Sequence, residues 1–146
     1  NFVYANFVYA NFVYANFVYA NFTDANFVYA KFADAIVNES TFGLTINCPE
    51  TGSFIAYKKA KGRIVTIRVE EDAKRSSATT YKCRCSKATV LEIEGVITEI
   101  SSNYDSSFIY RIGETIEVKD FDDNRWNECS TGIHFFINRK MAECYN

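Results

Sequence analysis

The sequence predicts a mainly β protein in two parts: a solenoid of short repeats, followed by a small mainly β α+β domain. A five-residue unit repeats through residues 1–35. Composition then changes sharply, because all six glycines lie at or after Gly43 and 31 of the 34 charged residues lie after residue 35. The later residues contain short strand-like runs separated by turn residues, which is the pattern of a compact domain of short strands.

The repeat unit is Asn1-Phe2-Val3-Tyr4-Ala5, which recurs unchanged as far as Ala20 and in modified form as far as Ala35. In an α-helix, residues five apart would lie roughly 140° from one another, so the phenylalanines would have no common face. In one straight strand they would point to opposite sides. The chain must therefore bend once per repeat, which predicts a solenoid with every phenylalanine inside. Beyond residue 35 the five-residue register continues with fewer matching residues. It places Phe42 on the phenylalanine position and ends near Leu44.

The Ala-Asn-Phe-x-x pattern resembles that of the pentapeptide-repeat proteins. This resemblance implies a right-handed quadrilateral β-helix over residues 1–46, with four repeats in each turn and the phenylalanine and alanine side chains inside. Residues 20 apart should then stack. The predicted stacks are Phe2 with Phe22, Phe7 with Phe27, Phe12 with Phe32, Phe17 with Val37, Phe22 with Phe42 and, on the outside, Tyr9 with Tyr29.

Residues 47–146 predict a mainly β α+β domain that caps the coil and carries recognition. The predicted strands are 54–58, 63–69, 88–93, 96–100, 108–112, 115–118 and 133–137. Residues 139–145 predict a short helix with Asn138 as its N-cap. The motifs Cys48-Pro49-Glu50-Thr51-Gly52 and Lys82-Cys83-Arg84-Cys85, with residues 125–136, resemble an uncharacterised domain often fused to pentapeptide repeats in bacterial and phage proteins.

Composition excludes several classes of protein. The net charge is −2, so no global basic field exists to bind nucleic acid. The repeats carry only three charges, so they do not imitate the phosphates of DNA. No apolar run approaches the roughly 20 residues that span a bilayer. No secretory signal is visible, and we expect a cytoplasmic protein of a bacterial or phage-infected cell.

Basic side chains beside hydroxyl residues favour a site for a small anionic ligand such as a nucleotide. The candidate ligand-binding residues are Lys74, Arg75, Lys82, Arg84 and His134. The alternative is a solvated charged face balanced by nearby acidic residues. This small-ligand binding or sequestering protein is our first alternative function.

The five cysteines and single histidine leave two further alternatives. Cys83 and Cys85, with Cys129 or His134, could complete a zinc site, whereas reduced buried thiols are the simpler interpretation. Cys129 and His134 could form a nucleophilic pair, which would make the protein a Cys–His enzyme. We expect no catalytic residue, no metal and no cofactor.

Our preferred function is a non-enzymatic structural or protein-interaction module, with the coil as spacer and assembly surface. The outward tyrosines Tyr4, Tyr9, Tyr14 and Tyr19 suit protein contact. The chain opens inside a repeat, so we expect either further coils or an exposed edge that associates with a second copy or another protein. We expect Trp126 to anchor the core.

Overall fold

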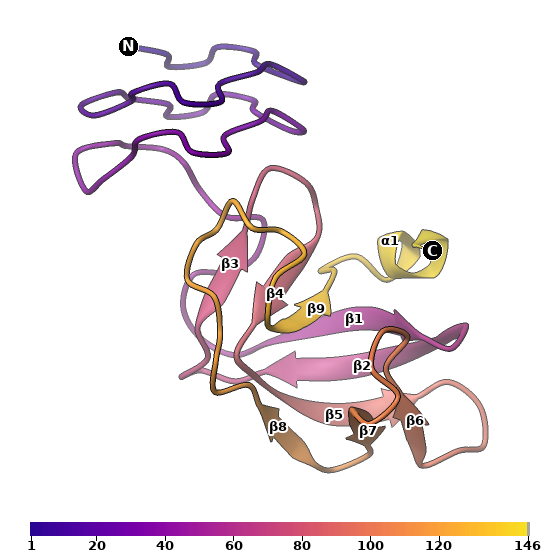
Figure 1. The fold of residues 1–146 in the computed structure, drawn as a ribbon. Helices are drawn as coiled ribbons and strands as arrows, with labels where there is room; N and C mark the ends of the chain where they lie inside the picture. The colour runs from indigo at the N-terminus through magenta and orange to yellow at the C-terminus, as the bar shows by residue number, and fades with distance from the viewer. Residues whose placement is uncertain (146) are drawn as a thin grey trace.

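The computed structural model describes residues 1–145, and Figure 1 shows two parts, one above the other. The repeat segment (residues 1–43) runs in flat loops that lie over one another. The C-terminal part (residues 44–145) holds the labelled strands and the helix. The chain is therefore mainly β, as predicted. Within residues 1–145, the structure has no helix with the length and apolarity that a membrane crossing requires.

Backbone hydrogen bonds join each loop of the repeat segment to the next. The amide of Phe2 donates to the carbonyl of Asn21 at 2.8 Å, and the amide of Asn26 donates to the carbonyl of Ala5 at 2.8 Å. Parallel bridges join Asn6 to Asn26 and Asn11 to Lys31, and each of these spans 20 residues. The chain thus returns over itself after four repeats.

The phenylalanine rings meet inside the loops. Phe2 lies over Phe22 with 5.2 Å between ring centroids, and Phe12 lies 5.2 Å from Phe32. Phe22 and Phe32 are 0% and 2% exposed, whereas Phe2 and Phe12 of the first loop are half-buried. The predicted stacks of these rings are confirmed, as is that of Tyr9 with Tyr29 outside.

Each repeat bends at its fourth residue, which has a positive φ; Tyr4 and Tyr14, for example, have φ of 62° and 64°. The asparagine that begins the repeat stabilises the bend. The side-chain oxygen of Asn1 accepts a hydrogen bond from the amide of Val3 at 3.1 Å, and the same bond recurs from Asn6. A side chain that bonds two residues ahead is typical of asparagine in turns. This bond explains why most repeats begin with asparagine.

The predicted stack of Phe22 with Phe42 is wrong. Asn21 bridges to Phe42, which is 21 residues away rather than 20, so one extra residue enters the last bend. Phe42 consequently points outward and is 61% exposed. Gly43 takes the position against Phe22, with φ of +81°, and a Cβ there would lie 2.6 Å from the Phe22 carbonyl carbon. The five-residue phase in the sequence could not show this insertion.

The C-terminal part contains a four-stranded antiparallel sheet in the order β1-β2-β5-β8. Its strands are β1 (Phe54–Ala60), β2 (Arg63–Val69), β5 (Lys87–Ile93) and β8 (Thr115–Glu117). A three-stranded sheet holds β3 (Arg75–Ser77), β4 (Cys83–Cys85) and β9 (Ile133–Phe135), and β6 (Glu99–Ser101) pairs with β7 (Ile109–Arg111). The helix α1 (Arg139–Cys144) follows. Ile67, Val69, Val90 and Phe135 are fully buried in the core.

Most predicted elements of this part exist, with shifted ends. Alternation along residues 63–69 correctly predicted β2, and the side-chain oxygen of Asn138 accepts from the amide of Lys140 at 2.8 Å, which confirms the N-cap. The predicted strand at 96–100 is wrong at its start, because Val96 is fully exposed and β6 begins at Glu99. The strands β3 and β4 were not predicted, because they are three residues long and carry no apolar run.

The connection between β3 and β4 closes the lower end of the repeat segment. The hydroxyl of Thr79 donates to the carbonyl of Ala30 at 2.6 Å, and the amide of Tyr29 donates to the carbonyl of Thr79 at 3.1 Å. The ring of Trp126 stacks on that of Phe32. The C-terminal part therefore continues the backbone ladder of the last loop and covers its apolar interior.

Arg125 holds this junction together. Its half-buried guanidinium donates to the carbonyls of Ser77, Leu44, Thr45 and Ala78, so it joins the segment after the repeats to the β3–β4 connection. Burial lowers the pKa of Arg125 to about 10. The guanidinium also lies 4.6 Å from the centroid of Trp126.

Candidate functional site

Two of the predicted ligand-binding residues are bonded to the backbone. The guanidinium of Arg84 is 1% exposed and donates to the carbonyls of Asp122, Thr131 and Asn124 at 2.7, 3.0 and 2.9 Å. It therefore holds the loop between β8 and β9. Arg75 in the same way donates to four carbonyls, those of Pro49, Gly52, Glu70 and Glu71.

Lys74 lies apart from the other predicted residues. Its ammonium is exposed and lies 3.8 Å from the carboxylate of Asp123. Among the described residues, no hydrogen bond or ion pair joins Lys74 or Arg75 to His134. Arg84, in contrast, is the cross-strand partner of His134 on β4 and β9.

His134 is half-buried and serves the fold. Its Nε2 lies 2.8 Å from the carbonyl oxygen of Ser130. The ammonium of Lys58 donates to the backbone carbonyl of His134 at 3.0 Å. Burial, with the positive charges of Lys82, Lys58 and Arg84, lowers the pKa of His134 to about 4. The ring is consequently neutral at physiological pH.

The cysteines fall into two groups. Cys48, Cys83 and Cys85 are buried, whereas Cys129 and Cys144 are exposed. Over residues 1–145, no group of three or more histidine, cysteine or acidic side chains is arranged to hold a metal ion. Burial raises the pKa of Cys85 to about 12, so its thiol stays protonated. Within the described residues, no hydrogen bond joins Cys129 to His134, and the Cys–His alternative is unsupported.

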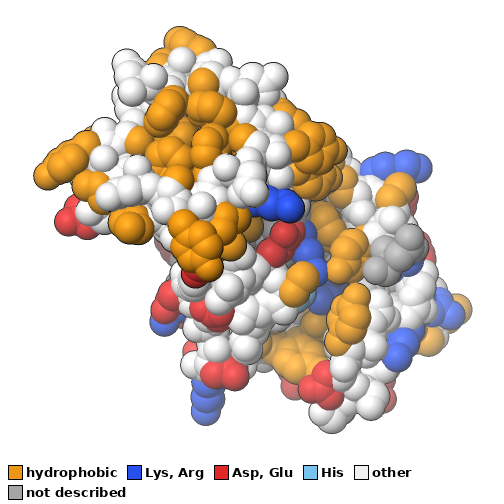
Figure 2. All heavy atoms as spheres, turned by 45° about the horizontal axis from the view of Figure 1, so that its top comes forward, with side chains coloured by type: hydrophobic (Ala, Val, Ile, Leu, Met, Phe, Trp, Pro, Cys, Tyr) orange, Lys and Arg blue, Asp and Glu red, His pale blue; other side chains and the backbone are white. Residues whose placement is uncertain are grey.

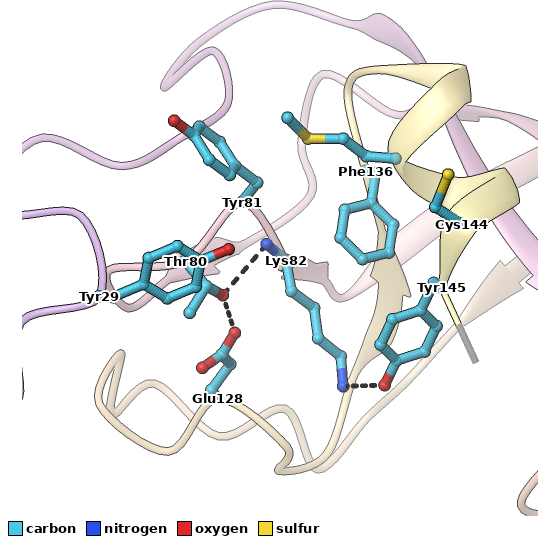
Figure 3. Close-up of a pocket in the computed structure, with 9 residues that line it drawn as sticks. Tyr29, Thr80, Tyr81, Lys82, Glu128, Phe136, Cys144 and Tyr145 are labelled. Carbon is cyan, nitrogen blue, oxygen red and sulfur yellow. Dashed lines mark hydrogen bonds between the residues drawn. The ribbon is translucent and has the colours of Figure 1, made fainter. Parts of the chain in front are cut away.

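A cleft that the sequence analysis did not find lies between the two parts of the chain (Figure 3). Its volume is about 450 Å³. The side chains that line it come from the repeat segment, the β3–β4 connection, the loop before β9, the residue after β9, and the helix with the residue that follows it. They are Tyr29, Thr80, Tyr81, Lys82, Glu128, Phe136, Met141, Cys144 and Tyr145.

Lys82 is the only one of the five predicted ligand-binding residues among those that line this cleft. Lys82 as a whole is 8% exposed. Its ammonium donates to the hydroxyl of Tyr145 at 2.8 Å and contacts the sulfur of Cys129 at 3.6 Å. Burial opposes the charge of Lys82, but the bonds to Tyr145 and Cys129 outweigh it, and the pKa of Lys82 is raised. The lysine is thus held as a cation in a largely apolar wall.

Glu128 and Thr80 form the opposite side of the cleft, as Figure 3 shows. The hydroxyl of Thr80 donates to the carboxylate of Glu128. Burial raises the pKa of Glu128, with the charge of Lys82 acting in the other direction. Among the described residues that line it, the cleft therefore has one ammonium and one carboxyl group, which are not paired with each other.

The four predicted surface tyrosines do not form one patch. Tyr4, Tyr9, Tyr14 and Tyr19 are 73–84% exposed and lie at four successive bends of the first loop. Tyr9 stacks on Tyr29 at 5.4 Å, with 9° between the ring planes. Within the described residues, no ring contact joins any two of the four. They surround the loop rather than line one side.

The architecture and the junction define a repeat protein whose lower end is covered by a small mainly β part. Residues 1–43 match the model of the pentapeptide repeats, in eight copies. Residues 44–142 match the model of a family described as "Family of unknown function (DUF5758)", and the chain belongs to that family. Comparison with curated proteins, and with solved structures, finds no match.

Proposed function

We propose that the protein is a non-enzymatic structural module that assembles through its repeats. Residues 1–43 form a right-handed quadrilateral β-helix that serves as spacer and assembly surface. The C-terminal part caps one end of this coil and carries recognition. The observation that supports this function best is the contrast between the last and the first loop of the repeats: the last is covered by Thr79 and Trp126, whereas the first, within the described residues, has half-buried rings and unpaired backbone groups.

The four-sided coil is supported by the period of the ladder and of the bends. The bridges of Asn6 to Asn26 and of Asn11 to Lys31 give 20 residues, or four repeats, to each turn. One residue with positive φ in each repeat supplies one corner. The right hand comes from the resemblance to pentapeptide-repeat proteins.

The first loop of the described residues combines apolar surface with free backbone groups. Figure 2 shows apolar side chains gathered in the middle of this loop. Phe2, Phe7 and Phe12 are only half-buried there, unlike Phe22 and Phe32 of the next loop. Exposed apolar surface of this kind favours association.

Backbone groups of the first loop point away from the second loop. Among the described residues, the amides and carbonyls of Asn6, Asn11 and Asn16 have no hydrogen-bond partner, whereas the amide of Asn26 bonds to Ala5. An unpaired strand edge is a template for another chain. A second copy of this coil offers the same perimeter and the same ladder spacing, so we expect two copies to pair end to end.

Sedimentation velocity over a range of protein concentrations tests this assembly. We expect the wild-type chain to dimerise as concentration rises, and the double variant Val3→Lys/Val8→Lys to stay monomeric because lysines protect a strand edge. The matched control is Leu91→Lys/Val96→Lys, which adds the same charge at exposed positions of the C-terminal part. A wild-type chain that remains monomeric throughout, or equal association of both double variants, would contradict the proposal.

A further inference from the structure

We propose that the cleft of Figure 3 binds a small planar aromatic acid, whose ring packs among the aromatic walls and whose anionic group binds Lys82. This inference rests on the recognition half of the proposed function and is independent of assembly through the first loop of the repeats. It is carried by the aromatic lining, by the buried cation, which has no carboxylate partner within residues 1–145, and by the one carboxyl group among the described lining residues.

The walls of the cleft suit a flat ring. Tyr29, Tyr81, Phe136 and Tyr145 bring four aromatic side chains to it from four separate segments of the chain. The rings of Phe136 and Tyr145 contact each other at 5.3 Å, with 53° between their planes. A volume of about 450 Å³ lies within the range of small-molecule sites, which are mostly apolar with a few polar groups.

Lys82 supplies the charge that selects an anion. Within the described residues, its ammonium has no carboxylate at ion-pair distance, and its two polar contacts are the hydroxyl of Tyr145 and the sulfur of Cys129. An ammonium has three hydrogens to donate, so one remains for a ligand. Buried charges in proteins are normally paired, and a ligand anion would supply the missing partner.

Two further cations, half-buried Lys58 and buried Arg84, strengthen this preference. The ammonium of Lys58 and the guanidinium of Arg84 bond to backbone carbonyls, and neither forms an ion pair among the described residues. Their charges, with that of Lys82, reach the ring of His134. The interior beside the cleft is therefore positive and attracts an anion.

Glu128 limits the charge of the ligand. Its carboxyl group lines the cleft and is held by the hydroxyl of Thr80. A ligand with several negative charges, such as a nucleoside triphosphate, would place one of them against this carboxylate. The cleft consequently favours a ligand with one anionic group over a polyanion.

Titration of the full chain, followed by two-dimensional amide NMR, tests the inference with three probes. Indole-3-acetate, indole-3-acetamide and tryptamine share one ring and carry negative, neutral and positive groups. We expect the acid to bind at least tenfold more tightly than the amide, tryptamine to bind more weakly still, and the amide signals of Tyr81, Lys82 and Glu128 to shift. The protein is kept below the concentration at which it associates, so failure here leaves the assembly proposal unaffected.

Variants decide the role of the ammonium. Lys82→Met keeps the length of the side chain and should make the acid and the amide bind equally, whereas Lys82→Arg should keep the preference. Lys74→Met removes an exposed charge elsewhere and should leave all affinities unchanged. Phe136→Leu should weaken the acid and the amide alike, which tests the aromatic wall even if Lys82→Met fails to fold.

Three results would overturn the inference. The first is no binding of the acid to the folded wild-type chain. The second is equal affinity of the wild-type chain for the acid and the amide. The third is a preference for the acid that persists in folded Lys82→Met. An affinity of Phe136→Leu for the acid and the amide equal to that of the wild-type chain would count in the same way.

Discussion

The ring of Trp126 lies nearly parallel to that of Phe32, with 4.8 Å between centroids and 13° between planes. Trp126 comes from the loop before β9, whereas Phe32 belongs to the last complete loop of repeats. This one contact continues the column of stacked rings out of the repeats and into the C-terminal part. Arg125 beside it bonds to four carbonyls at the junction, so the ring contact and these hydrogen bonds together join the two parts.

Replacement of Trp126 should uncover the repeats. We expect Trp126→Ala to lower the free energy of unfolding by about 2–4 kcal/mol, because a large aromatic contact is lost from the end of the ring column. Trp126→Phe should lose less, since it keeps a ring on Phe32. Urea unfolding measures both variants, and hydrogen exchange at the amides of Ala30 and Ala35 should accelerate in Trp126→Ala. Unchanged stability and exchange would show that the ring is not a cap.

Gly43 should resist replacement for two separable reasons. Gly43→Ala places a side chain at φ of +81° and within 2.6 Å of the Phe22 backbone, and we expect it to cost more than about 2 kcal/mol of stability. Gly113→Ala is the matched control, because Gly113 has φ of +85° and open space around it. Thermal unfolding should show a larger loss at Gly43. Equal losses would mean that backbone strain alone accounts for both.

The buried histidine predicts a specific pH dependence. The pKa of His134 falls to about 4 on folding from an ordinary value of 6.5, so protons bind the unfolded chain preferentially. Its contribution to stability is complete above pH 6.5 and is lost as the pH falls to about 4, by roughly 1–3 kcal/mol. His134→Gln keeps a donor for Ser130 and cannot titrate. Urea unfolding at several pH values should therefore show that the free energy of unfolding of His134→Gln falls less steeply with falling pH than that of the wild-type chain. Identical slopes for the two chains would contradict the lowered pKa of His134.

A substitution at the positive-φ residue of a bend should stabilise the protein. Tyr14 has φ of 64° and is 75% exposed, and asparagine adopts this left-handed conformation more readily than tyrosine. We expect Tyr14→Asn to raise the free energy of unfolding by about 0.5–1 kcal/mol. Tyr104→Asn, at a residue that is equally exposed and has no positive φ, should have little effect. A loss of stability at Tyr14 would show that its ring contributes more than its conformation costs.

The sequence by itself determined the periodic features of the protein. The five-residue period placed Phe22 and Phe32 inside, because a chain that bends at every repeat returns the same side chain to the same side. Alternation predicted β2, and Asn138 predicted the start of the helix, because each depends on residues a few positions apart.

The roles of the isolated residues become visible only in the folded chain. Arg75 and Arg84 look like ligand-binding residues along the chain, but in the fold they donate to carbonyls, most of them distant in sequence, as Arg125 also does. The extra residue that turns Phe42 outward and the cleft around Lys82 likewise depend on segments far apart in sequence. The physical reason is that hydrogen bonds and ring contacts depend on distance and direction in space, which the spacing of residues along a chain does not encode.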